Sequence, residues 1–89
     1  MKRADIPASE IIAAVDAFSN ALERHDYSNL RTPEVALAGK YPEKLVFARM
    51  QQLVDANVLE VGTSLRTAWV IRYGTGWEER LAEAIRKWG

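Results

Sequence analysis

The residues whose types and spacing suggest chemistry lie in the stretch 42–57, which the sequence predicts to be a helix. Lys44, Ala48 and Gln51 follow one another at intervals of four and three residues, which places them on one helix face. Gln52 flanks this face. A lysine ammonium binds anions, and a side-chain amide offers a donor beside an acceptor, so the face could recognise a polar partner. The alternative interpretation is an ordinary solvated helix surface, where such residues are common.

No other group of residues suggests chemistry. The chain has no cysteine and a single histidine, His25, so the usual spacings of metal ligands are missing. The serines lack a neighbouring base, the carboxylates are scattered among basic residues, and no glycine-rich phosphate loop is present. We therefore expect a protein that is not an enzyme and that binds no cofactor and no metal. His25 is expected to lie where the first helix ends.

A change in the spacing of apolar residues after Asn57 indicates how the chain is organised. Before Asn57 the apolar residues recur with helical spacing, and Pro7, Pro33 and Pro42 suit the first turns of three helices. After Asn57, β-branched and aromatic residues predict a hairpin. The predicted elements are helices over 7–25, 32–39 and 42–57, a hairpin over 58–73 and a final helix over 76–88. We expect one domain over 1–89, mainly α with a small β-hairpin.

The same spacing predicts which side chains form the core. On each helix the apolar residues share one face, and in the hairpin the large side chains are expected to point inwards. The residues expected to be buried are Val15, Phe18, Leu22, Val46, Met50, Leu53, Leu59 and Trp69.

The stretch from Thr32 to Tyr73 resembles the winged helix-turn-helix family of DNA-binding domains. The resemblance rests on Thr32-Pro33-Glu34 at the start of the second helix, on Val46, Met50 and Leu53 in the third, and on the step Asn57-Val58-Leu59 into the hairpin. It covers about half of the chain directly. It implies a winged-helix fold with a recognition helix over 42–57, a wing over 58–73 and an added C-terminal helix.

The resemblance also implies roles for residues of the recognition helix, because in this family its first turns enter the major groove. Lys44 is then expected to reach a phosphate or a guanine edge. Gln51 or Gln52 is expected to pair with adenine, and Ala48 to touch a thymine methyl group or to allow close approach.

Four further residues are expected to meet the DNA backbone on the same grounds. Arg66 in the wing is expected to reach a phosphate or the minor groove. Lys40 and Tyr41 in the turn between the second and third helices, and Arg31 just before the second, are expected beside phosphates. For Tyr41, packing in a half-buried position is the alternative.

The last predicted helix carries an apolar stripe made of Trp77, Leu81, Ile85 and Trp88. Two interpretations stay open for it. The stripe covers the first helix, or it forms the seam of a homodimer, since symmetric dimers are the commonest oligomers.

The charge of the chain is compatible with two classes of function, DNA binding and protein binding. The net charge is zero, although residues 31–72 hold six basic and four acidic side chains. We expect a small sequence-specific DNA-binding transcriptional regulator of phage, plasmid or bacterial type, with double-stranded DNA as its partner. The alternative is a winged-helix protein–protein interaction module that binds no DNA. The neutral charge and the apolar Leu45 and Phe47 favour this alternative.

No apolar run of membrane-spanning length and no signal peptide is seen, so we expect a cytoplasmic protein.

Overall fold

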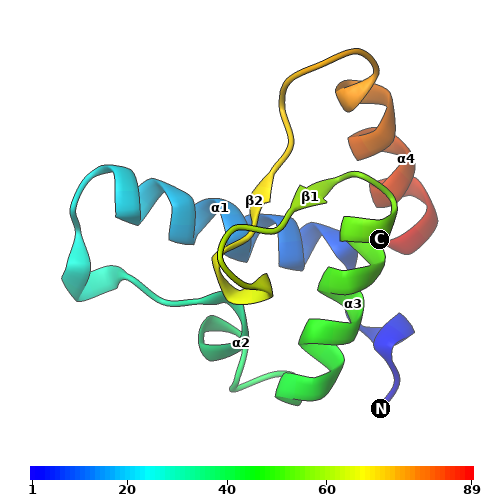
Figure 1. Ribbon diagram of the computed structural model, residues 1–89. Helices are drawn as coiled ribbons and strands as arrows, with labels where there is room; N and C mark the ends of the chain where they lie inside the picture. The colour runs from blue at the N-terminus through cyan, green and yellow to red at the C-terminus, as the bar shows by residue number, and fades with distance from the viewer.

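The computed structural model describes all 89 residues, and it is mainly helical with one two-stranded antiparallel hairpin (Figure 1). This confirms the predicted fold class. The four α-helices are α1 (Ala8–Glu23), α2 (Pro33–Ala36), α3 (Glu43–Asp55) and α4 (Trp77–Trp88). The strands are β1 (Leu59–Glu60) and β2 (Trp69–Val70), and three short 3-10 helices are η1 (Arg3–Asp5), η2 (Tyr27–Asn29) and η3 (Leu65–Thr67). All four helices lie within the predicted ranges, but α2 is shorter than the predicted 32–39, since it ends at Ala36 with Leu37 as its C-cap.

Helices α1 and α3 end in the same way, with a left-handed residue just past the last turn. Asn57 has φ +60°. The next amide, that of Val58, donates to the carbonyl of Leu53 at 2.9 Å. His25 has φ +55° after α1, and its ring nitrogen lies 2.9 Å from the Tyr27 hydroxyl. Both ends have the pattern of a Schellman motif, which pairs carbonyls that the helix leaves free. His25 therefore serves to end a helix.

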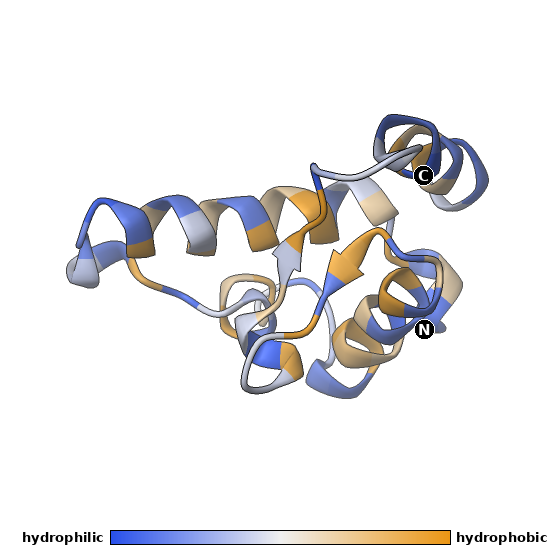
Figure 2. Ribbon diagram, turned by 45° about the horizontal axis from the view of Figure 1, so that its top comes forward, coloured by the Kyte–Doolittle hydropathy of each residue, from blue (hydrophilic) through white to orange (hydrophobic).

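The core lies between α1, α3 and the hairpin, and the hydrophobic parts of these elements face one another in Figure 2. Helix α3 contributes Val46, Met50 and Leu53, all fully buried. The N-terminal part of the chain adds apolar residues that the predicted core did not include. These are Ile6, Ala8, Ile11 and Ile12.

Two of the eight residues expected in the core are exposed, so the prediction was wrong for them. Leu22 is 48% exposed, because the last turns of α1 extend beyond the other helices (Figure 1) and the buried stripe there runs through Ala21. Trp69 is 38% exposed. Neighbouring residues of a strand point to opposite faces, and the inward position is taken by Val70, which pairs with Leu59.

The hairpin is shorter than predicted because its tip is not extended. Each strand has two residues, and the chain between them folds into η3, which packs against α3. Gly62 is required at the start of the tip, since an added Cβ would lie 2.8 Å from the carbonyl oxygen of Thr67. The tip (residues 62–67) is thus tucked against α3.

Helix α4 lies at one end of the molecule and packs on α1 (Figure 2). Ala84 is its most buried residue, and Leu81 and Trp88 contact the core from its sides. After α4, the carbonyl oxygen of Gly89 accepts a hydrogen bond from the amide of Ser9, at 2.7 Å, in the first turn of α1. None of the helices has the length and apolar character needed to cross a membrane.

Candidate functional site

Helix α3 has one side in the core and one side open to solvent. Because successive residues turn by about 100° around a helix, burial of Val46, Met50 and Leu53 leaves Lys44, Ala48 and Gln51 facing outwards. Lys44 and Gln51 are exposed and Ala48 is half-buried. The structure thus brings these three predicted residues together on one face, with the hairpin tip on one side of α3 and the N-terminal segment on the other (Figure 1).

The side chains of this face differ in how far other protein groups engage them. Lys44 belongs to none of the ion pairs of the structure. The Gln51 amide donates to the carboxylate of Asp55 one turn later, at 3.0 Å. Gln52 instead accepts a hydrogen bond from Arg49 at 2.6 Å. Of the two glutamines, Gln51 is therefore the one that faces solvent, and Gln52 supports a neighbouring side chain.

Arg66 of the hairpin tip is held against α2 and α3. Its Nε lies 3.3 Å from a carboxylate oxygen of Glu34, and its Nη2 lies 3.1 Å from Glu43. The guanidinium also sits over the ring of Phe47, 5.1 Å from the centroid. Glu34 is only 5% exposed, and its other oxygen, Oε1, has no hydrogen-bond partner. Arg66 thus lies beside the outer face of α3, with its charge balanced by carboxylates.

Lys40 and Tyr41 connect the turn before α3 to α1. The Lys40 ammonium lies 2.6 Å from one oxygen of Glu10, and the Tyr41 hydroxyl donates to the other. The bond from Lys40, and then that from Tyr41, lowers the pKa of Glu10. The bond to Glu10 in turn raises the pKa of Lys40 and of Tyr41. The half-buried position of Tyr41 fits the packing interpretation.

Arg31 folds back on its own segment. Its guanidinium donates to the carbonyls of Ser28 and Leu30, at 3.1 and 3.2 Å. Lys40, Arg66 and Arg31 are all engaged by protein groups, so a phosphate would have to compete with these contacts. Their role beside DNA stays a prediction.

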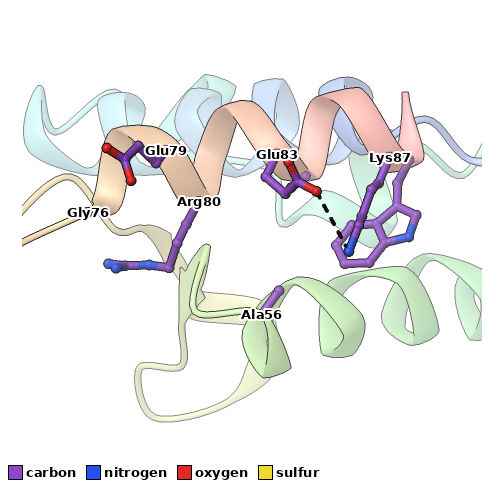
Figure 3. A pocket seen from close by; sticks show the side chains of 8 residues that line it. Ala56, Gly76, Glu79, Arg80, Glu83 and Lys87 are labelled. Atoms are coloured by element: carbon purple, nitrogen blue, oxygen red, sulfur yellow. Dashed lines mark ion pairs between the residues drawn. The ribbon is translucent and has the colours of Figure 1, made fainter.

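Two shallow hollows flank α3. One, of about 360 Å³, is lined by Phe47, Ser64, Leu65 and Arg66. The other, of about 440 Å³, lies between α4 and the end of α3 (Figure 3). There Glu83 pairs with Lys87 at 3.7 Å, and Arg80 donates to the carbonyls of Asn57 and Thr75. The second hollow carries charges of both signs.

The predicted stripe on α4 is divided by the fold. Leu81 and Trp88 are half-buried and contact the core, and Trp77 is half-buried. Ile85 is 42% exposed. The stripe thus covers the body of the molecule in part, and only its Ile85 side is open.

Arg49 is the residue of greatest structural interest that the sequence interpretation missed. It is 3% exposed, on α3 beside the core residues. It donates to the carbonyls of Ile6 at 2.8 Å, Ala4 at 3.3 Å and Trp88 at 3.4 Å. A charged residue three positions after Val46, on the edge of a predicted core stripe, was the available signal. The pairing of Glu34 with Arg66 left no such signal, because the two are far apart in sequence.

Comparison with protein-family models, with curated proteins and with solved structures gave no match. The winged-helix resemblance therefore rests only on the residues that suggested it.

Proposed function

We propose that this chain is a small sequence-specific DNA-binding protein of winged-helix type, whose helix α3 enters the major groove. The observation that carries the proposal is the two-sided character of α3. Its inner side is fully buried, and its outer side presents Lys44, Ala48 and Gln51 with no protein element over them. An ammonium and an amide around a small side chain suit the polar edges of bases and the close approach that reading them requires.

The neighbouring elements support this orientation. A helix that lies in the major groove has phosphates on both of its sides, and phosphate contacts set the position of a protein on DNA. The hairpin tip, with Arg66, lies against one side of α3. Such a protein would regulate transcription by occupying its site.

The balanced charge of the chain predicts how it binds. Arg66 and Lys40 are paired with carboxylates, so few cations remain to release counterions from DNA. The salt dependence of affinity should therefore come from the few cations without carboxylate partners, and much of the affinity should come from contacts to bases. Two copies bound one DNA turn apart, about 34 Å, would add to that affinity.

The test is selection of bound duplexes from random-sequence DNA at about 50 mM salt, followed by titration of variants. Gln51→Ala should lose discrimination between selected and random duplexes, by about 1–3 kcal/mol if the amide makes a bidentate contact. Lys44→Ala should weaken binding to both. The matched control is Asn20→Ala, at an exposed position of α1, and it should bind like the unchanged chain. Failure to select any duplex would refute the proposal.

A homodimer remains part of the proposal. Its seam would use the side of α4 that carries Ile85, the exposed member of the predicted stripe. Ile85→Asp should then give a folded monomer in sedimentation equilibrium, whereas Ala13→Asp, at an exposed position of α1, should leave the mass unchanged. Equal masses for the unchanged chain and Ile85→Asp would exclude this seam.

The second candidate function is a protein-interaction module. The carboxylates that balance Arg66 favour it, as does the hollow formed with Phe47 and Leu65 beside α3. If no duplex is selected, this candidate takes the place of the first. Substitutions at Leu65 would then be the ones to abolish binding of a partner, and substitutions at Lys44 would not.

A further inference from the structure

The N-terminal segment, residues 1–6, lies along α3 on the side opposite the hairpin tip. Arg49 binds the carbonyls of Ala4 and Ile6, and η1 packs against α3. Figure 1 shows the start of the chain beside α3, across that helix from the hairpin. The segment is thus held in place by a buried side chain.

The position of this segment follows from the helical turn of α3. With about 100° per residue, Arg49 and Gln52 lie to one side of the outer face, and Glu43 and Phe47 lie to the other. Arg49 holds the N-terminal segment, and Phe47 lies under Arg66 of the tip. The outer face that carries Lys44 and Gln51 therefore has one of these two segments at each edge.

The two basic side chains of the N-terminal segment have no carboxylate partners. Lys2 and Arg3 are exposed and belong to none of the ion pairs. Asp5, the acidic residue of the segment, accepts a hydrogen bond from the backbone amide of Lys2 at 2.7 Å. In this respect the segment differs from the opposite edge, where Arg66 is paired with Glu34 and with Glu43.

Arg49 adds a third positive charge to this edge. It is buried and has no carboxylate within ion-pair distance. Burial, and then the charge of Arg3, lowers its pKa. Three cationic side chains, Lys2, Arg3 and Arg49, thus belong to this edge of α3.

We propose that Lys2 and Arg3 form a second phosphate-binding edge, which contacts the DNA backbone on the side of α3 opposite the hairpin tip. This rests on the function proposed above. The major groove is about 12 Å wide, close to the diameter of a helix with its side chains. Phosphates therefore line both sides of an inserted helix. Lys2 and Arg3 would meet the phosphates of one strand, and the tip those of the other.

The test uses the full chain and a duplex selected as above. The variant is Lys2→Ala with Arg3→Ala. The control removes two exposed cations elsewhere, Arg24→Ala with Arg86→Ala, so that the net charge changes equally. The expected result is that the slope of log K against log salt falls by about 1.8 for the variant, since each phosphate contact contributes about 0.9. Affinity at about 50 mM salt should fall tenfold or more, equally for selected and random duplexes.

Phosphate ethylation interference gives the position of the contact. The unchanged chain should show interference on both strands that border the groove, and the Lys2, Arg3 variant should lose it on one strand only. Arg3→Lys should keep it. Because Arg49 holds carbonyls of the segment and not these side chains, the variant should melt like the unchanged chain.

Three outcomes separate this inference from the proposed function. If the Lys2, Arg3 variant matches the control while Lys44→Ala and Gln51→Ala lose binding, the second edge is refuted and the proposed function stands. If interference is lost on both strands together, the placement opposite the tip is refuted. If the unchanged chain binds no duplex, both are refuted.

Discussion

Arg49 and Arg66 are both held by protein groups, but by different ones. Arg66 is half-exposed and is paired with two carboxylates, whereas Arg49 is buried and donates to backbone carbonyls and to one amide. A buried cation held only by neutral acceptors is costly unless most of its N–H groups are satisfied. The four bonds of Arg49 meet this need, and three of them connect α3 to Ala4, Ile6 and Trp88.

Replacing Arg49 should therefore destabilise the fold markedly. Arg49→Met keeps much of the apolar volume but leaves the carbonyl of Ile6 without a donor inside the protein. Loss of hydrogen bonds of this kind should cost about 2–4 kcal/mol. Urea unfolding followed by circular dichroism measures this cost, with the exposed Arg24→Met as control. A variant that unfolds at the same urea concentration as the control would contradict the role given to Arg49.

The pairing of Lys40 with Glu10 predicts a dependence of stability on pH. The pKa of Glu10 is lowered in the fold, first by the bond from Lys40. The contribution of Glu10 to the free energy of unfolding is therefore complete above the pKa of an unfolded glutamate, about 4.3. It is lost as the pH falls through the lower pKa that Glu10 has in the fold. The pKa of Lys40 is raised, so its contribution is lost as the pH rises through that higher value.

In the Lys40→Met variant, stability should change less with pH, both at acidic pH, where Glu10 is protonated, and at alkaline pH, where Lys40 would lose its proton. The measurement is the melting temperature between about pH 3 and pH 11, with Lys44→Met as control because Lys44 has no ion pair. If Lys40→Met and the control lose the same stability at every pH, the pair contributes nothing measurable, as is found for many exposed pairs.

At the scale of the elements, the end of α3 decides how the hairpin leaves the helix. Asn57 has φ +60°, a conformation that costs other L-residues with a side chain about 1–2 kcal/mol. Asn57→Ala should therefore lower the free energy of unfolding by about 1 kcal/mol, and Asn57→Gly should leave it equal or higher. Urea unfolding of the two variants provides the check. Equal stability of the alanine and glycine variants would contradict the left-handed end.

The positions of the elements were predictable because local signals specify them. Pro33, Pro42 and Asn57 mark starts and ends, and the apolar spacing gives the register of α3. The exposure of Leu22 and Trp69 was not predictable in this way. It depends on how far α1 extends past the core and on which hairpin residue faces inwards. Neither is encoded in a short window of sequence.

The candidate site was predictable to a similar extent. The outward face of α3, with Lys44 and Gln51, follows from helical spacing alone. Apart from Gln52, the partners of Arg66, Lys40 and Arg49 lie 23 to 45 positions away in the chain, so only the folded structure could reveal them. These contacts matter because they decide which cations are free. The sequence suggested Arg66 and Lys40 for phosphates, whereas the structure leaves Lys44, Lys2 and Arg3 without ion pairs.

At the scale of the whole molecule, one face combines the outer side of α3 with two flanking segments. The hairpin tip is fixed to α3 through Arg66 and Phe47, and the N-terminal segment is fixed through Arg49. Both edges are thus held in place before any partner binds, which lowers the entropy cost of association. Helix α4, on the other hand, covers α1 at one end of the molecule.

The central claim is that the outer side of α3 is the surface that meets DNA. Its most direct test is a titration of the ¹⁵N-labelled chain with duplex DNA, selected or random in sequence, followed by amide NMR at about 50 mM salt. The account predicts saturable shifts that are largest at residues 44–51, with further shifts at the hairpin tip and at Lys2 and Arg3. An unchanged spectrum, or shifts confined to the hollow between α4 and the end of α3, would contradict it.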